Sequence, residues 1–171
     1  MKPVFGTFLC LLLLSCAAQA PREQSSQVST EQVSTKSDAS VETADISGVI
    51  GVEATKGSDD NYTFSVTIQS PDEGCDRYAN WWEVITEDGT LLYRRILAHS
   101  HVDEQPFTRS GGPVEIGSKD VVIVRSHMHP TGYHTQAMKG SFTDGFELVT
   151  LPTDFSIELS EIEPLPAGCS F

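Results

Sequence analysis

A two-residue alternation of apolar and polar side chains runs through most of the chain after residue 45, and it constrains the fold more than any other feature. It is clearest where Tyr62, Phe64, Val66 and Ile68 fall on one face of a continuous segment. This period is typical of strands that bury one side, whereas a helix repeats its apolar residues every 3.6 positions. The pattern therefore predicts an all-β domain over residues 45–171.

Other strands are expected at 46–52, 81–87, 90–98, 121–124, 146–151 and 155–159. Short strands at such intervals favour an antiparallel β-sandwich or a β-barrel. Asp88-Gly89 is typical of a two-residue hairpin turn. Such a turn pairs residues whose numbers sum to 177, so Glu83 faces Arg94 in an exposed ion pair and Trp82 faces Arg95, with its guanidinium stacked on the indole.

Residues 4–14 form an apolar run of eleven after Lys2, which is the length of a signal-peptide core and too short to span a bilayer. The run ends in Leu13-Leu14-Ser15-Cys16, which resembles a bacterial lipobox. The resemblance implies a signal peptide over residues 1–15, lipidation of Cys16 and anchoring in the cell envelope. Because residue 17 is not aspartate, it also implies the outer membrane in a two-membrane host. Plain secretion, with cleavage after Ala20, is the alternative.

Residues 16–44 contain the candidate lipidated cysteine followed by Ser, Thr, Gln, Ala and Glu, without an aromatic residue, Leu or Ile. Such a composition predicts a disordered tether. The whole chain has 24 acidic against 11 basic residues and a formal charge of −13. This balance excludes a general nucleic-acid binder, which needs a basic surface. The tether and charge together predict a domain displayed at some distance from the membrane.

Two cysteines remain in the mature domain, Cys75 and Cys169, each following a glycine. In an oxidising envelope such a pair predicts a disulfide. The sequence contains no Cys-x-x-Cys motif that would indicate a redox pair.

All five histidines fall between residues 99 and 134, and two His-x-His pairs stand out. Residues i and i+2 share a face in a strand, and imidazole is a ligand of Zn, Cu or Fe. One hypothesis is therefore a site for a divalent transition metal. The other is that the histidines are solvent-exposed polar residues without a metal, since the His127 and His129 face also carries Arg125. The candidate ligands are His99, His101, Glu104, His127, His129 and His134.

Part of this region is similar to the cupin motifs. The segment reads His99-x-His101-x2-Glu104-x6-Gly111, followed by Pro130-x-Gly132-x-His134. The resemblance implies a cupin-like β-barrel with His99, His101, Glu104 and His134 as metal ligands. Two spacings are one residue shorter than in cupins, and side-chain direction reverses at each step of a strand.

Aromatic and basic residues gather in two nearby stretches of this acidic chain. They define a candidate binding surface for a protein or glycan partner, composed of Trp81, Trp82, Tyr93, Arg95, Phe107 and Arg109. The stretch from Gln105 to Pro113 is expected to be a loop, either a crossover with Phe107 in the core or a ligand-binding loop.

The chain has two further resemblances. The segments 74–83, 93–113 and 125–133 are similar to exported bacterial proteins of unknown function. The Trp after a Cys, the long hairpin and the late Gly-Tyr turn resemble immunoglobulin- or fibronectin-type sandwiches, which implies a fold and no activity. No nucleophile-elbow, zinc-protease or phosphate-loop motif is present, and no catalytic residue is assigned. We therefore expect a lipid-anchored, non-catalytic binding or structural module without a cofactor; the alternative is a metal-binding protein or small cupin-like metalloenzyme.

Overall fold

The computed structural model describes residues 47–170. The predicted signal peptide (1–15), Cys16, the tether (16–44) and the outermost residues of the predicted domain (45, 46 and 171) lie outside this range. The described part is all-β with one short 3-10 helix, as the period of two predicts. The elements are β1 (Gly48–Lys56), β2 (Asn61–Gln69), β3 (Tyr78–Thr86), β4 (Leu91–Ile96), β5 (Phe107–Glu115), β6 (Val122–His129), β7 (Gly132–Tyr133), β8 (Gln136–Ser141), β9 (Gly145–Thr150) and η1 (Ile157–Glu161). Over residues 47–170 no helix is long and apolar enough to cross a bilayer.

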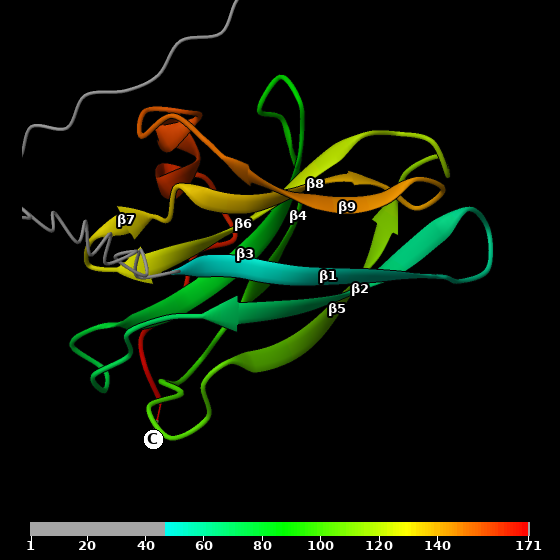
Figure 1. Ribbon diagram of the computed structural model, residues 1–171. Helices are drawn as coiled ribbons and strands as arrows, with labels where there is room; N and C mark the ends of the chain where they lie inside the picture. Colours follow the sequence, from blue (N-terminus) through cyan, green and yellow to red (C-terminus); the bar gives the residue numbers. More distant parts are fainter. Residues whose placement is uncertain (1–46, 171) are drawn as a thin grey trace, which may run out of the picture. The chain divides into compact units, whose positions relative to one another are not determined.

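The strands form one hydrogen-bonded sheet that curls into a nearly closed barrel (Figure 1). Its order is β4-β3-β6-β8-β1-β2-β5, with β7 paired to β6 and β9 paired to β8. The pairing is antiparallel except between β1 and β8, which meet in parallel at Gly48 and Gln136. The end strands β4 and β5 approach each other where Tyr93 packs on the backbone of Gly111, at which a Cβ atom would lie 2.6 Å from the Tyr93 hydroxyl.

The barrel interior holds the main core. The alternating residues of β2 that the sequence assigns to one face (Tyr62, Phe64, Val66 and Ile68) are all buried there, which confirms that prediction. The same cluster includes Trp82 and Val84 of β3, Val122 and Val124 of β6 and Phe107 of β5. Burial of these large side chains is the main source of stability.

The opposite face of β3, β6 and β8 is also buried, whereas the sequence predicts that the β6 face with Arg125 and His127 meets solvent. Residues 151–166, here called the C-terminal strap, fold back over this face beside β6 and β7 (Figure 1). Leu159 of the strap packs against Ile85, Ile123 and Ala137. The strap contains η1 and turns instead of the strand expected at 155–159, and Ser156 before η1 has a left-handed backbone with φ 46°.

Strand β5 replaces the loop expected between Gln105 and Pro113. Pro113 cannot donate a ladder hydrogen bond, which argues for a loop from sequence. It is accommodated because β5 pairs with β2 alone. The expectation that Phe107 enters the core is confirmed, since its side chain is buried.

The predicted hairpin register is confirmed: Trp82 pairs with Arg95 and Glu83 with Arg94. The turn itself differs, because the Thr86 amide donates to Thr90 and the loop has three residues. Gly89 takes the left-handed conformation that such a turn requires, with φ 87°. One extra residue in β4 then shifts the pairing by one position. Farther from the turn, the numbers of paired residues therefore sum to 177, as predicted.

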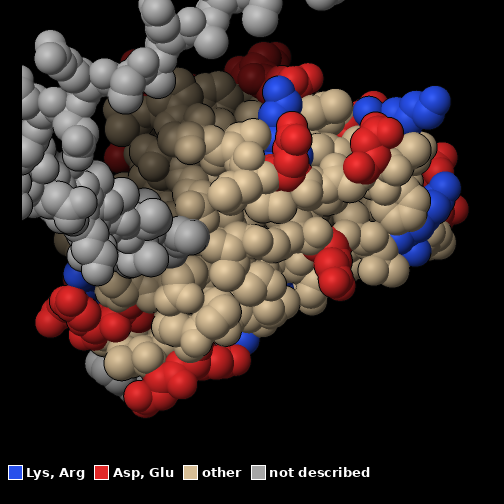
Figure 2. Space-filling model, in the orientation of Figure 1, with Lys and Arg blue, Asp and Glu red and all other residues tan. Residues whose placement is uncertain are grey.

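Figure 2 shows that one broad face of the molecule is largely uncharged, with acidic and basic side chains scattered toward its edges. Hydroxyl groups pair across β2 and β5 on the outer side of the barrel. Ser65 contacts Ser110 at 3.2 Å and Thr67 contacts Thr108 at 2.9 Å.

Candidate functional site

The loop from Leu97 to Pro106, between β4 and β5, is held in place by the buried carboxylate of Asp72. The backbone amide of His101 donates to Asp72 Oδ2 at 2.8 Å. The Ser70 hydroxyl and the Ala79 amide donate to Asp72 Oδ1 at 2.7 and 3.0 Å. These three hydrogen bonds to one buried carboxylate hold the loop against the segment before β3 and give it a defined shape.

The predicted disulfide between Cys75 and Cys169 is present, with its Cα atoms 5.5 Å apart. It joins the segment before β3 to the C-terminal end of the chain. Beside it, the Ser170 amide donates to the Ala98 carbonyl at 2.5 Å, and the Gly74 amide donates to Ser100 Oγ at 3.2 Å. The C-terminal end is thereby fixed against the same loop.

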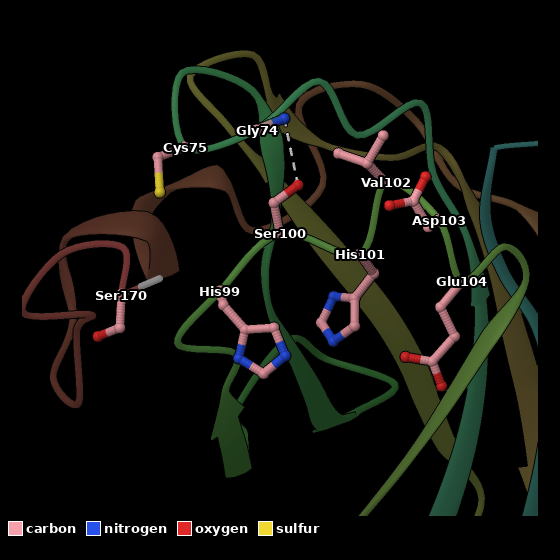
Figure 3. Close-up of a pocket in the computed structure, with 9 residues that line it drawn as sticks. All are labelled: Gly74, Cys75, His99, Ser100, His101, Val102, Asp103, Glu104 and Ser170. Carbon is pink, nitrogen blue, oxygen red and sulfur yellow. Dashed lines mark hydrogen bonds between the residues drawn. The ribbon is translucent and has the colours of Figure 1, made fainter.

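Together these segments enclose a pocket of about 420 Å³, here called the loop pocket. It is lined by Gly74, Cys75, His99, Ser100, His101, Val102, Asp103, Glu104 and Ser170 (Figure 3). Figure 3 shows the His101 ring between the side chains of His99 and Glu104. The ring centroids of His99 and His101 are 4.7 Å apart, with 38° between their planes.

His101 carries the unusual chemistry of the loop pocket. Its residue is only 4% exposed, and its ring stacks on Phe107 with centroids 3.8 Å apart. Neither ring nitrogen has a hydrogen-bond partner among the described residues. The nearest carboxylate oxygen, Asp72 Oδ2, lies 3.9 Å from Nδ1, which is too far for a hydrogen bond. Burial, followed by the positive charge of Arg109, lowers the pKa of His101, so the ring is neutral near pH 7.

Glu104 is engaged by a cation. Arg109 Nη2 and Nη1 donate to its two carboxylate oxygens at 2.7 and 3.2 Å. This hydrogen bonding lowers the pKa of Glu104, which is therefore ionised at neutral pH. Both of its oxygens are therefore engaged by the Arg109 guanidinium.

The other candidate ligands lie elsewhere. His127 Nδ1 is hydrogen bonded to Asn80 Oδ1 at 2.7 Å, and its ring stacks on Trp81 at 3.7 Å. His134 Nδ1 contacts Ser126 Oγ at 2.9 Å, and His129 at the end of β6 is exposed. Across residues 47–170, no group of three or more His, Cys, Asp or Glu side chains is arranged to hold a metal ion. The loop pocket thus brings together His99, His101 and Glu104 but not His134.

The face of β6 that carries Arg125 and His127 is not solvent-exposed, which corrects that expectation. The C-terminal strap covers it. Burial, followed by the charge of Arg94, lowers the pKa of His127 to about 3. A shallow pocket of about 680 Å³ lies beside this histidine, lined in part by Tyr133 and by Leu165 of the strap.

The Glu83–Arg94 pair is buried rather than exposed and belongs to a larger cluster. Arg94 Nε and Nη2 donate to Glu83 Oε2 at 2.8 and 2.6 Å, and Arg125 Nε donates to Oε1 at 2.9 Å. The remaining guanidinium donors bind carbonyls of the strap, including Leu159 O at 2.7 Å and Ser156 O at 2.9 Å. These bonds explain how a strap without strand pairing is held on the sheet.

The proposed aromatic and basic surface is not assembled. Trp81, Trp82 and Phe107 are buried, with 3%, 0% and 1% exposed. Arg95 is exposed but does not stack on Trp82, because that indole points into the barrel. The guanidinium that lies over an indole is Arg94, 4.6 Å from the centroid of Trp81. Two of the histidines are held by Asp72 and Asn80. The sequence does not identify these two residues as functional, because they are typical only of turns and strand edges.

Comparison with known proteins relates part of the chain to a named protein. No family model matches the chain, and no solved structure matches it. Over 75 residues the chain is 45% identical to a protein of Halomicrobium mukohataei named "Putative lipoprotein". The matched stretch is 44% of this chain and 37% of that protein, so the chain spans just over a third of the relative. The likeness agrees with a lipoprotein leader, and the fold is that of an all-β, nearly closed barrel.

Proposed function

We propose that this protein is a lipid-anchored protein of the cell envelope whose barrel is a non-catalytic module that binds a small ligand or ion in the loop pocket. An acylated Cys16 would hold the chain at the membrane, and residues 17–44 would separate the barrel from it. Two observations support the anchor: the Leu13-Leu14-Ser15-Cys16 leader and the likeness to a protein named as a lipoprotein. Two or three acyl chains on one cysteine give stable attachment, whereas a single chain binds only marginally.

The observation that carries the binding role is His101. A buried imidazole with two unpartnered nitrogens costs about 1–3 kcal/mol in the unliganded protein. Folded proteins retain such groups where a ligand, an ion or an ordered water satisfies them. The loop around it is fixed by Asp72 and by the disulfide, so the pocket is formed in advance of binding.

A binding role fits better than acyl transfer. One hydroxyl–imidazole pair exists in the barrel, Ser126 with His134. Ser126 is fully buried, so a substrate carbonyl could not reach its Oγ.

The anchor is tested by growing cells expressing the full chain with labelled palmitate and fractionating them. We expect label on the wild-type protein and its recovery with membranes. The Cys16→Ser variant should carry no label. An unlabelled wild-type protein in the soluble fraction would refute the anchor.

The pocket is tested separately by thermal unfolding of the mature protein against a panel of divalent metal ions, monosaccharides and small carboxylates. A compound that uses the loop pocket should raise the unfolding temperature of the wild type and of His129→Ala, but not of His99→Ala. Ligand binding to the native state alone produces such a shift. If no member of the panel gives a shift that depends on His99, the binding role is wrong.

A further inference from the structure

We propose that His99 and His101 form a two-imidazole site for a transition-metal ion of the Cu²⁺ class, with water completing the coordination. This inference rests on the proposed binding role of the loop pocket and names its ligand. It differs from the four-residue cupin pattern, because His134 is bonded to Ser126 and Glu104 is paired with Arg109.

The separation of the two rings suits a shared ion. Metal–nitrogen bonds of about 2.0–2.1 Å place the centroids of two imidazoles roughly 4.5–5.2 Å apart when the angle at the metal is about 90–110°. The centroids of His99 and His101 are 4.7 Å apart. Figure 3 shows the two rings next to each other on the same side of the loop backbone. The spacing of the rings is therefore that of two ligands of one ion, and the ring of His101, whose nitrogens are both buried, must shift for Nε2 to reach that ion.

The orientation of His101 also matches that of a metal ligand. Its Nδ1 is the nitrogen nearer Asp72 Oδ2, at 3.9 Å, which leaves Nε2 for the ion. Metal-binding histidines commonly donate their other N–H to a carboxylate, which fixes the ring and its tautomer. A movement of about 1 Å would bring Nδ1–H within hydrogen-bond distance of Asp72. Both orphaned nitrogens of His101 would then be satisfied.

Charge around the loop pocket favours a cation despite one nearby arginine. Asp72 lies behind His101, and Asp103 and Glu104 line the pocket. Arg109 opposes them, but its guanidinium is already paired with Glu104 at 2.7 Å. The net charge of −13 over the whole chain adds a long-range attraction for cations.

The ligand set selects the metal. Imidazole suits Zn, Cu, Fe and Ni, whereas Ca²⁺ and Mg²⁺ need several oxygen ligands. With two protein ligands the site is weak for most divalent ions. Cu²⁺ stands at the top of the affinity order for nitrogen sites, so it is the ion expected to bind measurably.

The test uses the full mature protein, extracted from membranes in detergent without a histidine tag and treated with a chelator. CuSO4 is titrated, bound copper is counted by elemental analysis, and electron paramagnetic resonance reports the number of imidazole nitrogens. We expect one Cu²⁺ per chain with two equatorial imidazoles. His99→Ala should lose at least tenfold in affinity and show one imidazole, and His99 is exposed enough that the fold should tolerate the change. His101→Gln should act similarly.

His129→Ala is the matched control, because it removes an exposed histidine outside the loop pocket. It should leave both the stoichiometry and the signal unchanged. The proposal is overturned if wild type binds no stoichiometric Cu²⁺, if His99→Ala retains full affinity, or if His129→Ala abolishes binding. Failure here, combined with a His99-dependent thermal shift from a sugar or carboxylate, would leave the binding role standing. Loss of the palmitate label would instead refute the anchor alone.

Discussion

Replacing Glu83 by glutamine should destabilise the protein by about 3–5 kcal/mol, because it removes the anion that pairs with two buried guanidinium groups. The side chains of Glu83, Arg94 and Arg125 are 0%, 0% and 1% exposed. Their three charge-assisted hydrogen bonds are 2.6–2.9 Å long. Such bonds contribute about 1.5–3 kcal/mol each.

The expected loss is smaller than the sum of these bonds for two reasons. Glutamine keeps one acceptor oxygen, and the arginines keep their bonds to the C-terminal strap. The variant nevertheless leaves two cations close together without a counter-ion, in a region where water cannot screen them. A typical domain is stable by only 5–15 kcal/mol, so the change should also lower Tm by roughly 10–20 °C.

Urea unfolding of the mature protein, followed by fluorescence of the buried Trp81 and Trp82, measures the change. Glu53→Gln is the control, because Glu53 is exposed on β1 and should change the free energy of unfolding by about 0.5 kcal/mol or less. A loss below about 1 kcal/mol for Glu83→Gln, or equal losses in the two variants, would refute the interpretation of this cluster.

Three further predictions concern other parts of the barrel. The pKa of His127 is about 3 in the folded protein and about 6.5 when unfolded, so the unfolded state binds its proton first as the pH falls. Stability should therefore decline between pH 6.5 and 3 by up to about 1.4 kcal/mol per pH unit from this group, and urea titrations should show a shallower decline for His127→Gln. Removing the disulfide with Cys75→Ala and Cys169→Ala together should lower the free energy of unfolding by at most about 4–5 kcal/mol, measured by urea unfolding. An unchanged free energy of unfolding would contradict the view that the disulfide stabilises the fold by restricting the unfolded chain. Gly89→Ala should lower Tm more than Gly145→Ala, although both glycines have φ near 80–90°, because a Cβ at Gly89 would overlap a hydroxyl of the C-terminal strap whereas the space beside Gly145 is open; equal Tm losses in calorimetry would contradict the placement of the strap.

The strand register and the disulfide could be predicted because both depend on local information. The Asp88-Gly89 turn and the alternation along β3 place Glu83 opposite Arg94, and the export signal makes a pair of cysteines an expected disulfide. The environment of Glu83 could not be predicted in the same way. Alternation assigns a residue to a face of the sheet, but it does not state whether that face meets water.

The loop pocket was only partly predictable for the same reason. The His-x-His spacing identifies His99 and His101 as neighbours, and their rings are indeed 4.7 Å apart. The sequence does not show that Asp72, nearly thirty residues earlier, would hold the loop, or that Arg109 would occupy Glu104. Such partners depend on long-range packing and carry no periodic signal.

By itself, the sequence determined the all-β class of residues 47–170, the register of the β3–β4 hairpin and the pairing of Cys75 with Cys169, because two-residue periodicity, turn chemistry and cysteine count are local properties. Only the tertiary structure decided that one sheet closes on itself and that the strap buries its second face. Curvature and coverage arise from contacts between residues far apart in the chain, such as Arg94 with Leu159. The same contacts turn an apparently exposed ion pair into a buried one and leave His101 without a hydrogen-bond partner among the described residues.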